Sequence, residues 1–141
     1  MNIPQTYFDL ILDEFKDVQV LCEKAETLDD ALYYFSALYG VVNRVMNFYC
    51  DPVLVFMHNV LQATHKAISD RIAMPIKSGI TSNGVTEEMW QALFSCTRLL
   101  TDAFEKKDED EIRQVLQKLT NISYAATGNG RYLQLRGKLS L

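Results

Sequence analysis

The chain has 141 residues, of which 48% are hydrophobic and 23% are charged, and these values are ordinary for one globular domain. Its 14 basic and 18 acidic residues give a formal net charge of -4. This is the wrong sign for a protein that binds nucleic acid through the phosphate backbone. We therefore expect a single folded domain without a nucleic-acid partner.

The cysteines and the N-terminal residues indicate the cellular compartment. Cys22, Cys50 and Cys96 are far apart and form no C-x-x-C pair, so neither a disulfide framework nor a zinc site is predicted, and we expect reduced, buried thiols. The N-terminal residues lack the basic start of a signal peptide, and the longest apolar stretch, 52–57, is too short to span a bilayer. These features predict a soluble cytoplasmic protein without membrane association, and no motif indicates a cofactor.

Two amphipathic helices are predicted first, at 4–25 and from 28 to about 49. Both carry apolar residues at alternating steps of three and four, which is the spacing of one buried helix face. Thr27 can cap the second helix, and the turn between them is short, so we expect an antiparallel pair. The first apolar stripe is Phe8, Ile11, Phe15, Val18, Cys22 and Ala25; the second is Leu28, Ala31, Phe35, Leu38, Val42, Val45 and Tyr49.

The segment 28–49 is apolar over most of its circumference. Only a narrow stripe of Ser36, Gly40, Asn43, Arg44 and Asn47 is polar or small. A helix of this kind needs neighbours on several sides, so we expect it to be either the central helix of the domain or part of a subunit interface.

Three further helices are predicted at 52–73, at 86–106, and from Asp108 or Asp110 to about 126. Asp51-Pro52 is a strong helix start, and Thr86 can cap the fourth helix. The glycines at 128–130 end the fifth helix.

These elements predict an all-α fold, an antiparallel, left-handed four-helix bundle of long helices with an additional helix between the two hairpins. The first, second, fourth and fifth helices would form the main layer, and 52–73 would pack across or beside it. Residues 1–130 form the bundle domain. Residues 131–141 form a basic and apolar tail that we expect to dock on the bundle or on a partner subunit.

Metal chemistry has little support. His58 and His65 are the only histidines and lie two turns apart, whereas two ligands on one helix usually stand three or four residues apart. No metal site is predicted, and we expect both histidines on a solvated polar face. No base is placed to activate a serine or cysteine, so no catalytic residue is predicted.

Two pairs of carboxylates have a spacing that magnesium sites use. The spacings Glu23-x-x-Glu26 and Glu105-x-x-Asp108 resemble those on the magnesium-binding helices of all-α nucleotide pyrophosphatases. Both pairs fall at hairpin turns, however, where acids commonly cap and solvate helix ends, and they are far apart along the chain. A metal-dependent nucleotide hydrolase is therefore the third of three functional hypotheses.

The leading hypothesis is a non-enzymatic interaction or assembly protein that forms a homo-oligomer, with a dimer favoured, because the apolar surface exceeds what one small bundle buries. Its candidate interface residues are Tyr33, Tyr34, Tyr39, Tyr132 and Leu135. The alternative is a regulatory module that binds a small molecule or anion through Arg44, His58 and His65, which requires a pocket bordering those residues.

Overall fold

The computed structural model describes residues 1–73 and 87–126, except for the side chains of 71–73, 87–90 and 125. Its helices are α1 (Gln5–Lys24), α2 (Leu28–Met46), α3 (Pro52–Ala73), α4 (Glu87–Glu105) and α5 (Glu109–Ala125). No strand occurs in this part of the chain, so the all-α prediction is confirmed for it. None of its helices is long and apolar enough to cross a membrane. The predicted tail at 131–141, with Tyr132 and Leu135, lies outside the described residues.

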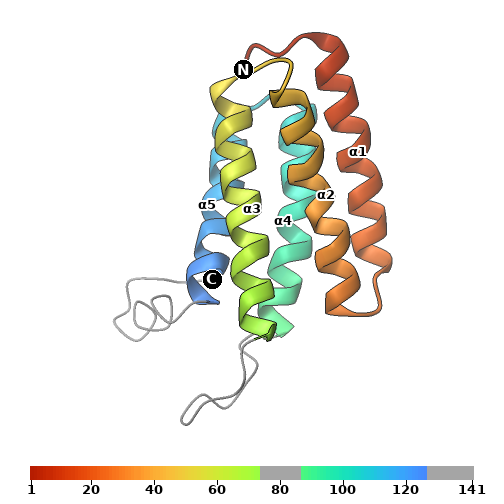
Figure 1. The fold of residues 1–141 in the computed structure, drawn as a ribbon, viewed down its shortest axis with the longest axis vertical. Helices are drawn as coiled ribbons and strands as arrows, with labels where there is room; N and C mark the ends of the chain where they lie inside the picture. Colours follow the sequence, from red (N-terminus) through yellow and green to blue (C-terminus); the bar gives the residue numbers. More distant parts are fainter. Residues whose placement is uncertain (74–86, 127–141) are drawn as a thin grey trace.

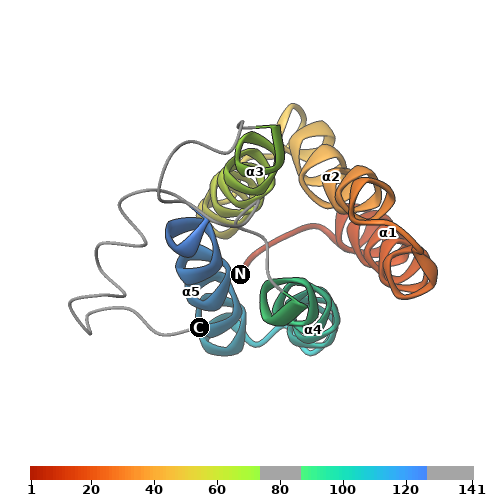
Figure 2. The same cartoon turned by 90° about the horizontal axis from the view of Figure 1, so that it is seen from below.

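The helices stand side by side and form a ring when seen from the end (Figures 1 and 2). The order around the ring is α1, α2, α3, α5, α4, and α4 closes it by contacting α1. Successive helices of the chain alternate in direction, so all neighbours in the ring are antiparallel except α3 and α5, which run the same way.

The predicted four-helix layer is not confirmed, because α3 takes a full place in the ring between α2 and α5. The reason lies in the inner face of α3, where a continuous row of residues is buried. A helix with such a face is stabilised by neighbours on both flanks, and this draws it into the wall of the bundle instead of across it. The row is Leu54, Met57, Leu61, Thr64 and Ile68.

The apolar stripes predicted for 4–25 and 28–49 meet the buried side chains of α4 and α5 inside the ring. An aromatic cluster marks the contact of α1 with α4, where the ring centres of Phe8 and Phe104 lie 4.7 Å apart and those of Phe15 and Phe104 lie 5.4 Å apart. Phe15, Phe35 and Phe104 are each fully buried. The core therefore runs along the axis of the ring and receives side chains from all five helices.

Side-chain caps fix where three helices begin, as their sequences predicted. The Thr27 hydroxyl accepts a hydrogen bond from the Asp30 amide (3.1 Å), and the Asp108 carboxylate accepts one from the Glu111 amide (3.0 Å). The Asp51 carboxylate accepts one from the Val53 amide (2.9 Å). These caps satisfy amides that have no partner within the helix.

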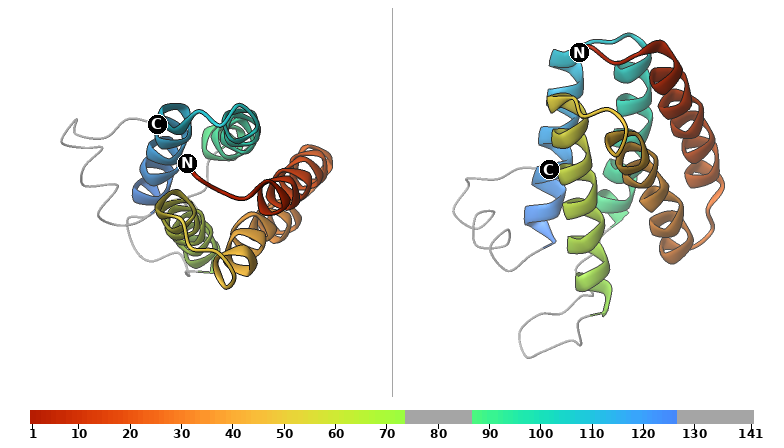
Figure 3. Two further views of the ribbon diagram at one scale, coloured as in Figure 1. Left: turned by 90° about the horizontal axis from the view of Figure 1, so that it is seen from above. Right: turned by 45° about the horizontal axis from the view of Figure 1, so that its top comes forward.

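Residues 1–4 cross the upper end of the ring from α1 toward the start of α3 and α5 (Figure 3). The Tyr49 hydroxyl donates to the Asn2 carbonyl (2.6 Å), and the Asn2 amide donates to the second carboxylate oxygen of Asp51 (3.3 Å). Asp51 thus caps α3 and anchors this segment with the same side chain. The hydrogen bonds from the Val53 and Asn2 amides satisfy both carboxylate oxygens, so this acid can be buried.

The turn from α4 to α5 is closed by paired backbone hydrogen bonds. The Lys107 amide donates to the Phe104 carbonyl (3.0 Å) and the Asp108 amide to the Ala103 carbonyl (3.1 Å). This is a Schellman motif, which requires a left-handed residue at the position of Lys107. Lys107 has a φ of 56° there, a conformation that favours glycine.

Candidate functional site

Arg44 does not meet the two histidines with which the anion-binding hypothesis grouped it. It points from α2 toward α1, where its guanidinium forms an ion pair with Glu14. His58 and His65 lie on α3, beside the opposite flank of α2. Arg44 and the two histidines therefore lie on different flanks of α2.

The two histidines are half-buried against α2, whereas we expected them on a solvated face. Tyr39 of α2 lies between them, with ring centres 6.1 Å from His58 and 5.6 Å from His65, both edge-on. Burial lowers the pKa of His65, and a hydrogen bond with the backbone of Leu32 opposes that shift. The ring contacts of Tyr39 with His58 and His65 therefore hold α2 against α3.

No group of three metal-ligating side chains occurs within 1–73 and 87–126. The two carboxylate pairs do not converge either. They lie at the C-terminal ends of α1 and α4, which are at opposite ends of the bundle (Figure 1). Glu23 instead accepts hydrogen bonds from Arg98, which lower its pKa, and Glu105 accepts one from Lys16 (2.7 Å). Both acids therefore join α1 to α4 through ion pairs.

Of the proposed interface tyrosines within the described residues, which are Tyr33, Tyr34 and Tyr39, Tyr33 faces solvent, with 75% of its surface exposed. Tyr34 packs edge-on against it, with ring centres 5.8 Å apart, and is partly buried against the core. Tyr39 is occupied by the histidines of α3. Among the candidate interface residues that the structure describes, Tyr33 and its neighbour Tyr34 are therefore the ones placed for contact with another molecule.

Further exposed apolar side chains share one side of the α1–α2 pair with Tyr33. Leu10 and Leu21 of α1 are 45% and 43% exposed, and Phe48, just after α2, is 77% exposed. We call Leu10, Leu21, Tyr33 and Phe48 the hairpin surface.

Helical spacing places the hairpin surface along the junction of α1 and α2. Leu10 and Leu21 stand four residues before and seven after Glu14, so they share its side of α1. Tyr33 and Phe48 stand eleven residues before and four after Arg44, so they share its side of α2. Because the helices are antiparallel, Phe48 lies level with Leu10, and Tyr33 lies about one turn from the level of Leu21.

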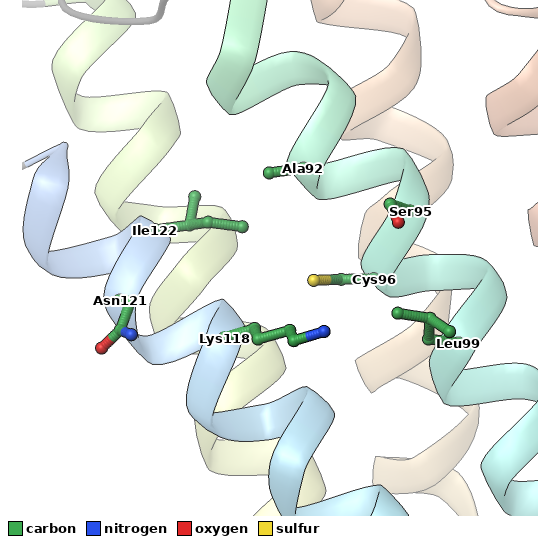
Figure 4. A pocket seen from close by; sticks show the side chains of 7 residues that line it. All are labelled: Ala92, Ser95, Cys96, Leu99, Lys118, Asn121 and Ile122. Atoms are coloured by element: carbon green, nitrogen blue, oxygen red, sulfur yellow. The ribbon is translucent and has the colours of Figure 1, made fainter. Parts of the chain in front are cut away.

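A second feature is a hollow of about 410 Å³ between α4 and α5 (Figure 4). Lys118 of α5 extends across it toward α4, and Cys96 of α4 points into it. The remaining lining residues are Ala92, Ser95, Leu99, Asn121 and Ile122. Burial raises the pKa of the Cys96 thiol to about 11, and the nearby Lys118 charge opposes the shift.

The sequence predictions missed this hollow. Cys96 and Ile122 are buried on the inner faces of α4 and α5, but the spacing of apolar residues does not show that the two helices leave a hollow at this level. The sequence carries no signal for the hollow, because an exposed base such as Lys118 is ordinary on the polar side of an amphipathic helix. Cys50 was also misjudged, because it is exposed, whereas Cys22 and Cys96 are buried.

Comparisons of this chain with protein families, with curated proteins and with solved structures gave no match. Its function is therefore argued from the geometry above.

Proposed function

We propose that this protein is a non-enzymatic helical assembly protein that forms a homodimer through its hairpin surface. The observation that carries this proposal is the pairing of Glu14 with Arg44 in the middle of a strip of exposed apolar side chains. Exposed apolar patches mark surfaces that bind protein. Complementary charges within such a surface fix the register of the two partners.

The hairpin surface is complementary to itself under two-fold symmetry. If the symmetry axis runs parallel to the helices, α1 of one copy lies against α2 of the other at the same level. Glu14 then faces Arg44 of the second copy, and Leu10 faces its Phe48. Opposite charges and apolar side chains are then paired across the interface, and neither copy has to change its fold.

The size of the surface is sufficient. A helix of 20 residues such as α1 is about 30 Å long, and two packed helices are about 20 Å wide. This face offers roughly 600 Å² on each copy, or about 1,200 Å² in total, at the lower end of the range of specific interfaces.

The test uses two charge-reversal variants, Glu14→Arg and Arg44→Glu, and molar mass by light scattering. Each variant alone places like charges across the proposed interface and should be monomeric. In an equimolar mixture, a heterodimer joins one reversed pair and one native pair, both attractive, so the dimer should return. The pair within each chain stays repulsive on mixing, so only an intersubunit contact predicts this rescue.

A matched control is the ion pair between Lys16 and Glu105, which joins α1 to α4 away from the hairpin surface. Lys16→Glu and Glu105→Arg should leave the dimer intact, separately and mixed. A monomeric wild-type protein would overturn the proposal. So would a dimer that both Glu14→Arg and Arg44→Glu leave unchanged, or one that mixing does not restore.

A further inference from the structure

We propose that the hollow between α4 and α5 binds a small carboxylate with an apolar body. The hollow lies across the ring from the hairpin surface, so this inference is independent of the dimer (Figures 2 and 4). Its volume of about 410 Å³ falls within the range of small-molecule sites.

The charge at the hollow argues for an anion. Lys118 reaches across it, and none of the ion pairs among the described residues involves Lys118. Most of the other described bases already have acidic partners, for example Arg98 with Glu23 and Lys16 with Glu105. The chain has a net charge of -4, so it does not attract anions in general. An ammonium without an acidic partner among the described residues attracts a negative ligand to the hollow beside it.

The lining argues for one carboxylate on an apolar body. A phosphate is usually bound by several cationic or amide donors, whereas this hollow offers a single ammonium with the polar side chains of Ser95 and Asn121. One positive charge balances one carboxylate. The other four lining side chains carry no charge at neutral pH and match a hydrocarbon or ring; they are Ala92, Cys96, Leu99 and Ile122.

The test titrates the full chain with octanoate by calorimetry and compares it with octanamide, which has the same carbon skeleton but no charge. Octanoate should bind in a saturable one-to-one manner, and octanamide about tenfold more weakly or worse, because it loses the charge-assisted contact. Lys118→Gln should abolish the preference for octanoate. Lys24→Gln, which removes an exposed lysine from α1, should retain it.

Cys96 supplies a second readout. In a Cys50→Ser background, octanoate should slow the alkylation of Cys96 and leave that of Cys22 unchanged, because only Cys96 lines the hollow.

Three results would overturn the proposal. The first is no saturable octanoate binding to the wild-type chain. The second is binding that Lys118→Gln does not weaken. The third is displacement of octanoate by inorganic phosphate at equal concentration, which would show a site for anions without the apolar part.

Discussion

The ammonium of Lys107 lies 4.5 Å from the ring centre of Phe8. The residue that turns the chain from α4 into α5 therefore also packs on α1, and its amine lies 3.3 Å from the side-chain oxygen of Gln5. This contact offers a physical reason for a lysine at a position whose backbone favours glycine. Two opposing effects meet at one residue, and they can be separated by substitution.

Lys107→Ala and Lys107→Gly form a matched pair for this purpose. Both lose the contact with Phe8, but only glycine also relieves the left-handed backbone. We expect Lys107→Gly to be more stable than Lys107→Ala by about 1 kcal/mol in urea unfolding. Equal stabilities would contradict a left-handed residue at this turn.

Gly40 lies in the middle of α2, and among the described residues a methyl group added there meets only the Arg44 guanidinium, at 4.0 Å. Glycine within a helix costs roughly 0.5–1 kcal/mol relative to alanine. Gly40→Ala should therefore raise the free energy of unfolding by about that amount. Urea unfolding should be measured at protein concentrations low enough for the monomer to dominate. A less stable Gly40→Ala monomer would mean that the added methyl group clashes with its surroundings.

The three thiols should differ in reactivity. Burial raises the pKa of Cys22 to about 11, with a contribution from the Glu23 charge, and burial raises that of Cys96 to about 11 as well. Since the thiolate is the reacting form, both should resist iodoacetamide at about pH 8. Exposed Cys50 should be alkylated first. Peptide mass mapping over time measures the order, and early labelling of Cys22 would contradict its burial.

Stability should fall on mild acidification because of His65. Its folded pKa is lowered, so the unfolded chain binds the proton more readily. The contribution is fully present above the unfolded pKa of about 6.5 and is lost as the pH falls through the lowered folded value. Melting curves of wild type and His65→Gln at about pH 7.5 and pH 5.5 test this. The variant should lose less stability, and an identical loss would exclude His65 as a cause.

Two phenylalanines should respond oppositely to truncation. Phe104 is fully buried against Phe8 and Phe15, so Phe104→Ala should cost about 3–5 kcal/mol. Phe48 is 77% exposed, so Phe48→Ala should leave the stability of the monomer nearly unchanged while weakening self-association. Urea unfolding at low concentration and light scattering separate these effects.

Helix positions were largely predictable because their causes are local. Apolar spacing and the caps Thr27 and Asp51 act within a few residues, and the structure has both. The second helix was expected to reach Tyr49 but ends at Met46, and the Tyr49 hydroxyl beyond its end donates to the Asn2 carbonyl. That partner lies 47 positions away, and no local pattern reveals it.

The arrangement of helices and the sites were less predictable because they depend on which flanks meet. The spacing of His58 and His65 gave their common face, but not that Tyr39 covers it. Likewise, Arg44 was grouped with the histidines by its chemistry, whereas its helix turns it toward Glu14. The hollow at Lys118 arises only once α4 and α5 are docked.

The place of α5 in the ring constrains how the chain is made. Both of its neighbours, α3 and α4, leave the ribosome earlier, and they do not pack on one another extensively in the finished fold. Until α5 follows them, the inner faces around Leu61 and Leu100 lack a cover along one flank. A chain that has been synthesised only as far as α4 therefore exposes apolar surface that α5 covers in the finished fold, and such surface makes incomplete chains prone to aggregation.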